Sequence, residues 1–496
     1  MKILTTRISA VVFMLVLFLA SAQAQDRKLP VETAITTSHQ VTIKGQRVPY
    51  TATAGTQPVW DEKGDPIASL FYTYYERTDI SNKTKRPLVI SFNGGPGSAS
   101  IWMHLAYTGP KVLQIDDEGY PVQPYGFKDN PHSILDVADI VFVDPVNTGY
   151  SRITGEKVDR NLFFGVNEDI KYLSDWVNTF VTRQDRWASP KYLIGESYGT
   201  TRVSGMALQL QNAHWMYLNG VILVSPTGLG IDRSGPVSAA NYLPYYAATA
   251  WYHKVLPADL QAKDLDDILP EVEQYTLDVV IPAIARGGSL DPAKRKEIAT
   301  QMARYSGLNV DVILQHNLAV PTGFFWKELL RDQGLTIGRL DSRYRGIDAM
   351  DAGYGRDYDP ALTSWNHSFA PAMNMYAKQV LKFDTDLTYN LFGTVNPWNR
   401  NGDNTGANLR QAMLQNPYLH VMNQSGYYDG GTDYFNAKYN LWQINANGKL
   451  GDRLRFEGYR SGHMMYLRAE DLKNANDHVR DFIQKSMVAE GIPAKY

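Results

Sequence analysis

Between residues 88 and 224, short apolar runs alternate with stretches of helical periodicity, and this alternation restricts the fold more than any other feature of the chain. The predicted strands are residues 88–92, 138–143, 191–194 and 218–224, and the predicted helices are residues 166–183 and 200–211. Strands that alternate with helices form a mostly parallel sheet with helices on both faces. In such sheets the functional residues lie at the carboxyl ends of the strands. The sequence therefore predicts the α/β class.

The segments on either side of this alternation have other patterns. Residues 40–80 alternate polar with apolar side chains, which predicts antiparallel strands. Turns are expected at Gly45, Gly55 and Gly64. Residues 227–385 contain helical stretches, many aromatic residues and irregular loops, and a strand pattern returns at 418–422. We therefore predict one α/β domain that is interrupted by an insertion.

The predicted domain boundaries follow from these changes of pattern. The α/β core comprises residues 25–226 and 386–496, and a largely helical cap comprises residues 227–385. The alternative is that residues 227–385 form an independent second domain. The sequence contains no internal repeat, which would indicate a solenoid, and no low-complexity segment, which would indicate a linker.

The first residues have the three parts of a secretory signal. Lys2 and Arg7 give a positive start, residues 8–20 are apolar and uncharged, and small residues follow at 21–24. A membrane-spanning helix needs about 20 apolar residues, and this run is shorter. We therefore expect a cleaved signal peptide, residues 1–24, and a periplasmic or secreted protein. An uncleaved anchor is the alternative, and no later stretch is long and apolar enough to span a membrane.

Composition excludes several classes of function. The 496 residues contain 49 Lys and Arg against 51 Asp and Glu, without basic runs, and nucleic-acid binding needs clustered positive charge. Cysteine is absent, so the chain has no disulfide, no thiolate nucleophile and no cysteine metal site. The apolar fraction of 44% is that of a folded protein rather than a disordered one.

The pentapeptide Gly-Glu-Ser-Tyr-Gly, residues 195–199, follows a predicted strand and precedes a predicted helix. A sharp turn at this place exposes Ser197 above the sheet, and the two glycines remove side chains that would clash there. The helix N-terminus that follows supplies amide hydrogens and partial positive charge for an oxyanion. Ser197 is therefore a candidate nucleophile, and the alternative is an ordinary glycine-rich turn.

A serine nucleophile needs a base and an acid that orients the base. Most other histidines after Ser197 fall in the predicted cap, in an apolar strand or in a polar helical run, whereas His463 lies in a glycine-marked turn near the C-terminus. His463 is thus the candidate base. Asp429 is the first acid after the strand at 418–422, and Asp433 competes with it. The alternative for either aspartate is that it stabilises a turn.

A second oxyanion donor is expected in the loop after an earlier strand. Residues 93–97, Asn-Gly-Gly-Pro-Gly, follow the predicted strand at 88–92. Successive glycines let backbone amides approach a substrate closely. A plain tight turn is the alternative.

Five segments together resemble the serine carboxypeptidase family, and in particular its bacterial branch without cysteines. The segments are the Asn-Gly-Gly-Pro-Gly-Ser loop at 93–98, the Asp-Pro-Val-Asn-Thr-Gly-Tyr-Ser loop at 144–151, the pentapeptide at 195–199, the Ser-Gly-Tyr-Tyr-Asp run at 425–429 and the Gly-His-Met run at 462–464. Ordered motifs at such large separations are far more specific than any one of them. The resemblance covers nearly the whole chain after residue 24, and it implies the α/β-hydrolase fold.

The resemblance also implies a role for each matched residue. It implies Ser197 as nucleophile, Asp429 as orienting acid and His463 as general base, and it selects Asp429 over Asp433. It implies the amides of Gly95 and Tyr198 as the oxyanion hole, and Asn93 with Glu196 as the binding site for the C-terminal carboxylate of a peptide. By counting, Tyr107 stands where the family often has a further glutamate.

The reaction that this family resemblance implies is release of C-terminal amino acids from peptides through an acyl-enzyme, without a metal or an organic cofactor. The expected partner is thus a peptide with a free C-terminus. An esterase or acyltransferase that uses the same three residues is the nearest alternative, because a fold does not determine a substrate. A secreted binding protein with an inactive site is the remote one. Oligomeric state and side-chain preference do not follow from the sequence.

Overall fold

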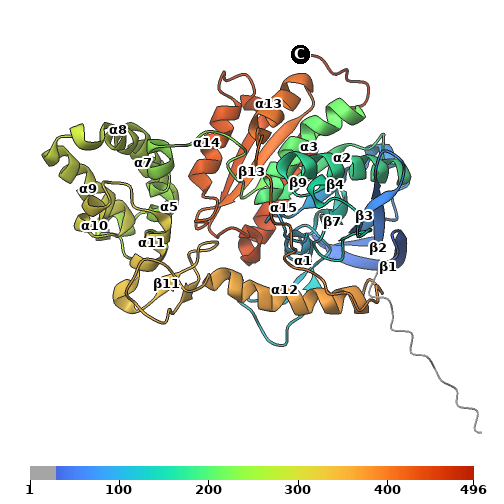
Figure 1. Ribbon diagram of the computed structural model, residues 1–496, viewed down its shortest axis with the longest axis horizontal. Coiled ribbons are helices and arrows are strands. Elements are labelled where there is room, and N and C mark those ends of the chain that lie inside the picture. The colour runs from blue at the N-terminus through green and yellow to red at the C-terminus, as the bar shows by residue number, and fades with distance from the viewer. Residues whose placement is uncertain (1–28) are drawn as a thin grey trace, which may run out of the picture.

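A ten-stranded sheet forms the centre of the molecule (Figure 1). The computed structural model describes residues 29–496, so the predicted signal peptide lies outside the described residues. The strand order is β1-β2-β3-β7-β4-β9-β10-β13-β14, and β8 pairs with β3. Within residues 29–496, no helix has the length and apolar character that crossing a bilayer requires.

The strands of the sheet divide into an antiparallel and a parallel part. The antiparallel strands are β1 (Thr33–Ile43), β2 (Gln46–Trp60), β3 (Pro66–Arg77) and β8 (Arg152–Ile153). The parallel strands are β4 (Leu88–Phe92), β7 (Asp139–Val143), β9 (Lys191–Glu196), β10 (Gly220–Val224), β13 (His420–Gly426) and β14 (Leu454–Tyr459). Strand β3 joins the two parts by antiparallel pairing with β7. This confirms the predicted mostly parallel sheet.

The turn expected at Gly55 is wrong, because this residue lies inside strand β2 opposite Ala34 of β1. A Cβ atom on Gly55 would lie only 2.2 Å from the carbonyl oxygen of Thr33. Glycine therefore permits close approach of two strands here rather than a change of chain direction. Gly45 and Gly64 have positive φ angles and lie in turns, as expected.

Helices cover both faces of the sheet. Successive strand side chains point to opposite faces: Ile90 and Val141 belong to one apolar core, and Val89 and Ile140 belong to the other. The first core is closed by α2 (Val166–Arg183), α3 (Tyr198–His214), α13 (Thr405–Gln415) and α14 (Tyr434–Ile444), and the second by α1 (Ile101–Ala106), α12 (Pro360–Gln379) and α15 (Ala469–Ser486). The arrangement is that of an α/β-hydrolase.

A separate group of helices lies beside the sheet and has an apolar core of its own (Figure 1). Its helices are α4 (Pro236–Ala240), α5 (Leu243–Tyr252), α6 (Ala258–Gln261), α7 (Leu265–Tyr275), α8 (Ile281–Arg286), α9 (Pro292–Ser306), α10 (Val310–Gln315) and α11 (Thr322–Glu328). Two short ladders complete the structure: β5 (Lys111–Leu113) with β6 (Phe127–Asp129), and β11 (Thr336–Ile337) with β12 (Arg345–Gly346).

All eight of these helices fall within the segment 227–385 that the sequence predicts as a cap. Helix α12 falls there too, but it packs under the sheet rather than with the other cap helices. The rings of Phe369 on α12 and Trp102 on α1 have centroids 4.5 Å apart. The last part of the inserted segment therefore belongs to the packing of the α/β core.

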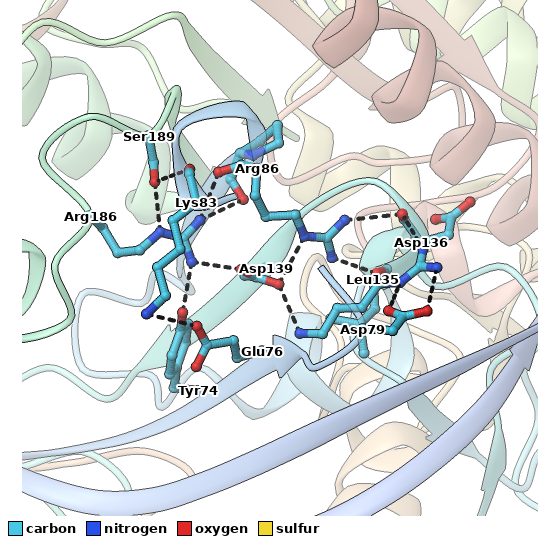
Figure 2. Close-up of polar contacts among 12 residues, drawn as sticks. Tyr74, Glu76, Asp79, Lys83, Arg86, Leu135, Asp136, Asp139, Arg186 and Ser189 are labelled. Atoms are coloured by element: carbon cyan, nitrogen blue, oxygen red, sulfur yellow. Dashed lines mark hydrogen bonds and ion pairs between the residues drawn. The ribbon is translucent and has the colours of Figure 1, made fainter. Parts of the chain in front are cut away.

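A buried charge network holds the amino ends of the parallel strands together (Figure 2). Asp139, the first residue of β7, accepts hydrogen bonds from Arg86 at 3.0 Å and from Arg186 at 2.6 Å. Arg186 also donates to the hydroxyl of Tyr74 and to the carbonyl oxygen of Arg86. The side chains of Asp139, Arg86 and Arg186 are at most 5% exposed, so each charge is stabilised by these partners rather than by water.

We expect Asp139→Asn to lower the free energy of unfolding by about 3 kcal/mol or more, because it leaves two buried guanidinium groups without a counter-charge. Denaturant unfolding measures this change. Glu297→Gln is the matched control, because it removes one charge from an exposed ion pair with Lys294, which contributes about 0.5 kcal/mol at most. Equal stability of the two variants would contradict the assigned role of Asp139.

Candidate active site

Ser197 lies at the sharp turn between β9 and α3. Its backbone angles are φ 57° and ψ −126°, a region that residues with a Cβ rarely occupy. The flanking glycines make this turn possible, since a Cβ on Gly195 would lie 2.2 Å from the carbonyl oxygen of Gly199. The amide of Ser197 donates to the carbonyl oxygen of Val224 on the neighbouring strand at 2.9 Å. The fold therefore holds the hydroxyl at the carboxyl end of the sheet.

His463 and Asp429 meet beside this turn. Nδ1 of His463 lies 2.7 Å from Oδ2 of Asp429, and both side chains are buried. Asp429 also accepts hydrogen bonds from the amide of Gly431 at 2.8 Å and from the hydroxyl of Thr432 at 2.7 Å. With Nδ1 engaged by the acid, Nε2 is the imidazole nitrogen available to a serine hydroxyl.

The two groups stabilise each other's charged forms. Burial raises the pKa of Asp429, but attraction to His463 and its hydrogen bonds outweigh burial and leave the pKa below its ordinary value. Burial lowers the pKa of His463, but Asp429 outweighs this effect and leaves the pKa above its ordinary value. The carboxylate thus holds the imidazole in place and favours its protonated form, as the predicted roles of orienting acid and base require.

Asp433, the competing acid, makes no contact of this kind. It is the N-cap of α14, and its Oδ1 accepts from the amide of Asn436 at 2.9 Å. Its Oδ2 accepts from the side-chain amide of Asn436 at 2.6 Å. Burial raises its pKa to about 6. Its carboxylate therefore caps the N-terminus of α14, which corresponds to the turn-stabilising role given above as the alternative.

The glycine loop after β4 packs directly against the start of α3. A Cβ on Gly94 would lie 2.4 Å from the amide nitrogen of Tyr198, so no other residue fits there. Gly95 follows with a φ of 104°, which is also a glycine conformation. The amides of Gly95 and Tyr198, the predicted oxyanion donors, thus belong to two backbone segments in close contact at the serine.

Asn93 and Glu196 form a buried pair next to Ser197. The side-chain amide of Asn93 donates to Oε1 of Glu196 at 3.0 Å, and the hydroxyl of Tyr466 donates to Oε2. Both side chains of the pair are at most 3% exposed. Burial raises the pKa of Glu196 to about 7, although attraction to His463 and the Tyr466 hydrogen bond oppose it. Glu196 therefore exchanges its proton near neutral pH.

Tyr107, which by counting stands where the family often has a further glutamate, has its hydroxyl bonded to a residue other than Glu196. Its hydroxyl donates to the side chain of Gln424 at 2.6 Å, and its ring stacks on that of Tyr466 with centroids 4.8 Å apart. Sequence reasoning missed Tyr466, the residue that does bind Glu196. Its position three residues after His463 was the available signal, but nothing in the residue type distinguished it from an ordinary buried tyrosine.

One cavity of about 450 Å³ brings these groups together. Its lining residues include Gly94, Gly95, Trp102, Glu196, Ser197, Arg339, Leu340, Phe392, Arg400, His463 and Met464. Ser197 and His463 thus face the same space as Glu196 and the glycine loop. Among residues 29–496, no group of three or more histidine or acidic side chains is arranged to hold a metal ion.

A short segment of the inserted region, residues 339–342, binds the loops that carry both the acid and the base. We call this segment the strap. Its Leu340 carbonyl oxygen accepts from the amide of His463 at 2.6 Å, and Asp341 accepts from the amide of Gly462 at 3.1 Å. On the other side, the amide of Gly430 donates to the backbone carbonyl oxygen of Arg339, and the amide of Ser342 donates to the backbone carbonyl oxygen of Tyr428. The strap therefore fixes the two loops relative to each other.

We expect Asp341→Asn to slow the reaction of Ser197 with a fluorophosphonate about tenfold or more, because it weakens the bond that positions the His463 loop. Gel-based labelling at several times measures the rate. Asp332→Asn is the matched control, an exposed aspartate in the same inserted region. A variant that melts at a lower temperature but labels at the original rate would show that Asp341 only stabilises the fold.

Comparison with known proteins identifies the relatives of this arrangement. Residues 46–279 match the family model of the serine carboxypeptidases. The pheromone-processing carboxypeptidase KEX1 of Kluyveromyces lactis is 33% identical over 132 residues, which are 26% of this chain and 19% of that protein. Serine carboxypeptidase-like 36 of Arabidopsis thaliana is 29% identical over 166 residues, 32% of this chain and 31% of that protein.

The fold extends the likeness beyond these sequence matches. The crystal structure of the prohormone-processing carboxypeptidase Kex1 from Saccharomyces cerevisiae matches with a TM-score of 0.51 and 16% identity, over 90% of this chain and 93% of that one. The sequence matches to the two curated relatives above span less than a third of either relative. The matched segment 46–279 carries the glycine loop and the serine turn, so this part of the chain is similar to the serine carboxypeptidases.

Proposed function

We propose that this protein is a serine exopeptidase that removes amino acids one at a time from the C-terminus of peptides. The observation that carries the proposal is the buried Asn93–Glu196 pair, in which Glu196 lines the same cavity as Ser197. A pair that binds a terminal carboxylate next to the nucleophile places the last peptide bond of a chain at the nucleophile. The match of residues 46–279 to the serine carboxypeptidase model and the resemblance of the motifs support the same reading.

In the proposed reaction the hydroxyl of Ser197 attacks the carbonyl carbon of the last peptide bond, and His463 accepts the hydroxyl proton. Asp429 orients the imidazole, and the amides of Gly95 and Tyr198 bind the oxyanion. The intermediate collapses as the C–N bond breaks, and the imidazolium gives its proton to the leaving amine. Water then attacks the acyl-enzyme with the same assistance, which releases the shortened peptide.

Recognition of the substrate carboxylate depends on the proton of Glu196. Two ionised carboxylates in a cavity from which water is largely excluded repel each other. The protonated form of Glu196 instead donates a hydrogen bond, and Asn93 supplies a second donor. Because burial raises the pKa of Glu196 to about 7, this form is present at and below neutral pH. The phenol of Tyr466 is a neutral partner that adds no competing charge.

The proposed location is the periplasm or the medium outside the cell. The basis is the basic, apolar and small-residue pattern of residues 1–24. Comparison of the N-terminal residue of the exported protein with that of the full translation product tests this proposal.

The first test of exopeptidase activity uses peptide pairs that differ only in a free or an amidated C-terminus. We expect kcat/KM for the amidated peptide to fall about 100-fold or more, because it lacks the charge that the Asn93–Glu196 pair binds. Ser197→Ala is the control for contaminating peptidases and should abolish release from both peptides. Equal turnover of the two peptides would argue against the carboxylate site, and turnover of esters alone would favour the esterase reading.

The second test concerns pH. We expect KM for a free peptide to rise about tenfold between pH 6 and pH 8, because ionised Glu196 repels the substrate carboxylate. In Glu196→Gln the side chain stays neutral, so KM should lose most of this pH dependence while kcat keeps the dependence that His463 gives it. Steady-state kinetics across this range measures both constants. A KM that rises equally in the two proteins would show that another group controls binding.

A further inference from the structure

The active-site cavity contains more positive charge than the proposed reaction needs. Arg339 and Arg400 both line it, and Glu196 is the only acidic residue among the lining residues. Because Glu196 carries a proton for part of the time near neutral pH, it offsets little of this charge. The oxyanion donors and the Asn93–Glu196 pair already account for the reacting carbonyl and the terminal carboxylate. Two guanidinium groups therefore remain without a role in the proposed reaction.

The side chain of Arg339 lines the cavity and is only loosely paired. It is 44% exposed, and it forms an ion pair with Asp359 in which Nε and Oδ2 are 3.9 Å apart, beyond hydrogen-bond distance. No hydrogen bond of this guanidinium to another described residue is found. By contrast, Arg343 in the same region binds Asp341 at 2.7 Å and is 2% exposed. Arg339 thus keeps donors that a planar carboxylate can accept in a bidentate manner.

Arg400 reaches the cavity from the loop that precedes α13. Its side chain is exposed, and within residues 29–496 it takes part in no ion pair. The neighbouring Trp398 packs edge-on against the ring of Tyr198, with centroids 5.3 Å apart. Arg400 therefore enters on the side of the serine turn, whereas Arg339 enters beside His463 through the strap.

These positions relate the two arginines to different parts of a peptide. His463 protonates the leaving amine, so the last residue of the substrate lies on the side of His463 and of Arg339. The acyl group that stays bonded to Ser197 belongs to the penultimate residue of the substrate, so this residue lies on the side of Arg400. This assignment rests on the proposed exopeptidase function.

We propose that the cavity selects acidic peptides, with Arg339 binding the side-chain carboxylate of the C-terminal residue and Arg400 binding that of the residue before it. The terminal carboxylate stays with the buried Asn93–Glu196 pair. The arginines lie at more exposed positions of the cavity, so their attraction depends on ionic strength. The preference is therefore a matter of charge rather than of side-chain size.

The test uses four N-acetylated peptides that end in Gln-Gln, Gln-Glu, Glu-Gln or Glu-Glu. We expect kcat/KM to rise about tenfold for each Gln that is replaced by Glu. Arg339→Gln should remove the preference at the last position only, and Arg400→Gln the preference at the position before it. Arg47→Gln, at the exposed start of β2 outside the cavity, is the matched control and should keep both preferences.

Two results would overturn the proposal. The first is equal kcat/KM for Gln and Glu peptides in the unmodified protein. The second is a fall in kcat/KM in Arg339→Gln or Arg400→Gln that is the same for all four peptides, because it would place that arginine on the terminal carboxylate. Calorimetric binding of the same peptides to Ser197→Ala separates this proposal from the exopeptidase function, since it reports charge preference without turnover. If C-terminal amino acids are released without a charge preference, the exopeptidase function is retained and the proposed selection of acidic peptides is wrong.

Discussion

The bond between Nδ1 of His463 and Oδ2 of Asp429 is the contact on which the active site depends, because it joins two loops that follow different strands of the sheet. Neither loop is held by the sheet alone. The strap, residues 339–342, contributes a carbonyl oxygen and a carboxylate to one loop and binds the other as well. The inserted region therefore completes the chemical site, in addition to any part that it has in enclosing substrate.

The two ends of the parallel strands treat buried charge in opposite ways. At the amino ends, Asp139 neutralises Arg86 and Arg186, and every partner is within hydrogen-bond distance. At the carboxyl ends, Glu196 is buried with a pKa of about 7, and Arg339 lies 3.9 Å from the carboxylate of Asp359, beyond hydrogen-bond distance. Tightly paired charges stabilise the fold, whereas loosely paired charges in a cavity are available to a ligand. The contrast separates the structural end of the sheet from the end that does chemistry.

Local periodicity was enough to predict the core of the fold. The alternation over residues 88–224 predicted β4, β7, β9, β10, α2 and α3 to within about three residues at each end, because apolar spacing directly reflects burial on a sheet or helix face. The short elements α1, β5, β6 and β8 in the same range were not predicted. Gly55 was misread because a strand that needs close approach and a turn that needs positive φ both favour glycine. Tyr466 was missed because its role depends on a tertiary contact with Glu196, to which no local pattern refers. The family resemblance, by contrast, selected Asp429 over Asp433, and Asp429 is the one that lies within hydrogen-bond distance of His463, while its catalytic role stays a prediction.

The inserted helices pack around an apolar core of their own, while the strap that follows them is bonded to the loops of the α/β core. Of these helices, α5 and α7 also contact the α/β core, through the apolar cluster of Ala248, Leu265 and Leu269 with Tyr428, Tyr434 and Phe435 and through the ion pair of Glu273 with Lys438. The remaining helices rely mostly on one another for stability and can therefore vary more. The strap has no such freedom. Chimeric proteins that exchange the helices with those of a relative should consequently place the junction before residue 338, so that the native strap stays with its own sheet.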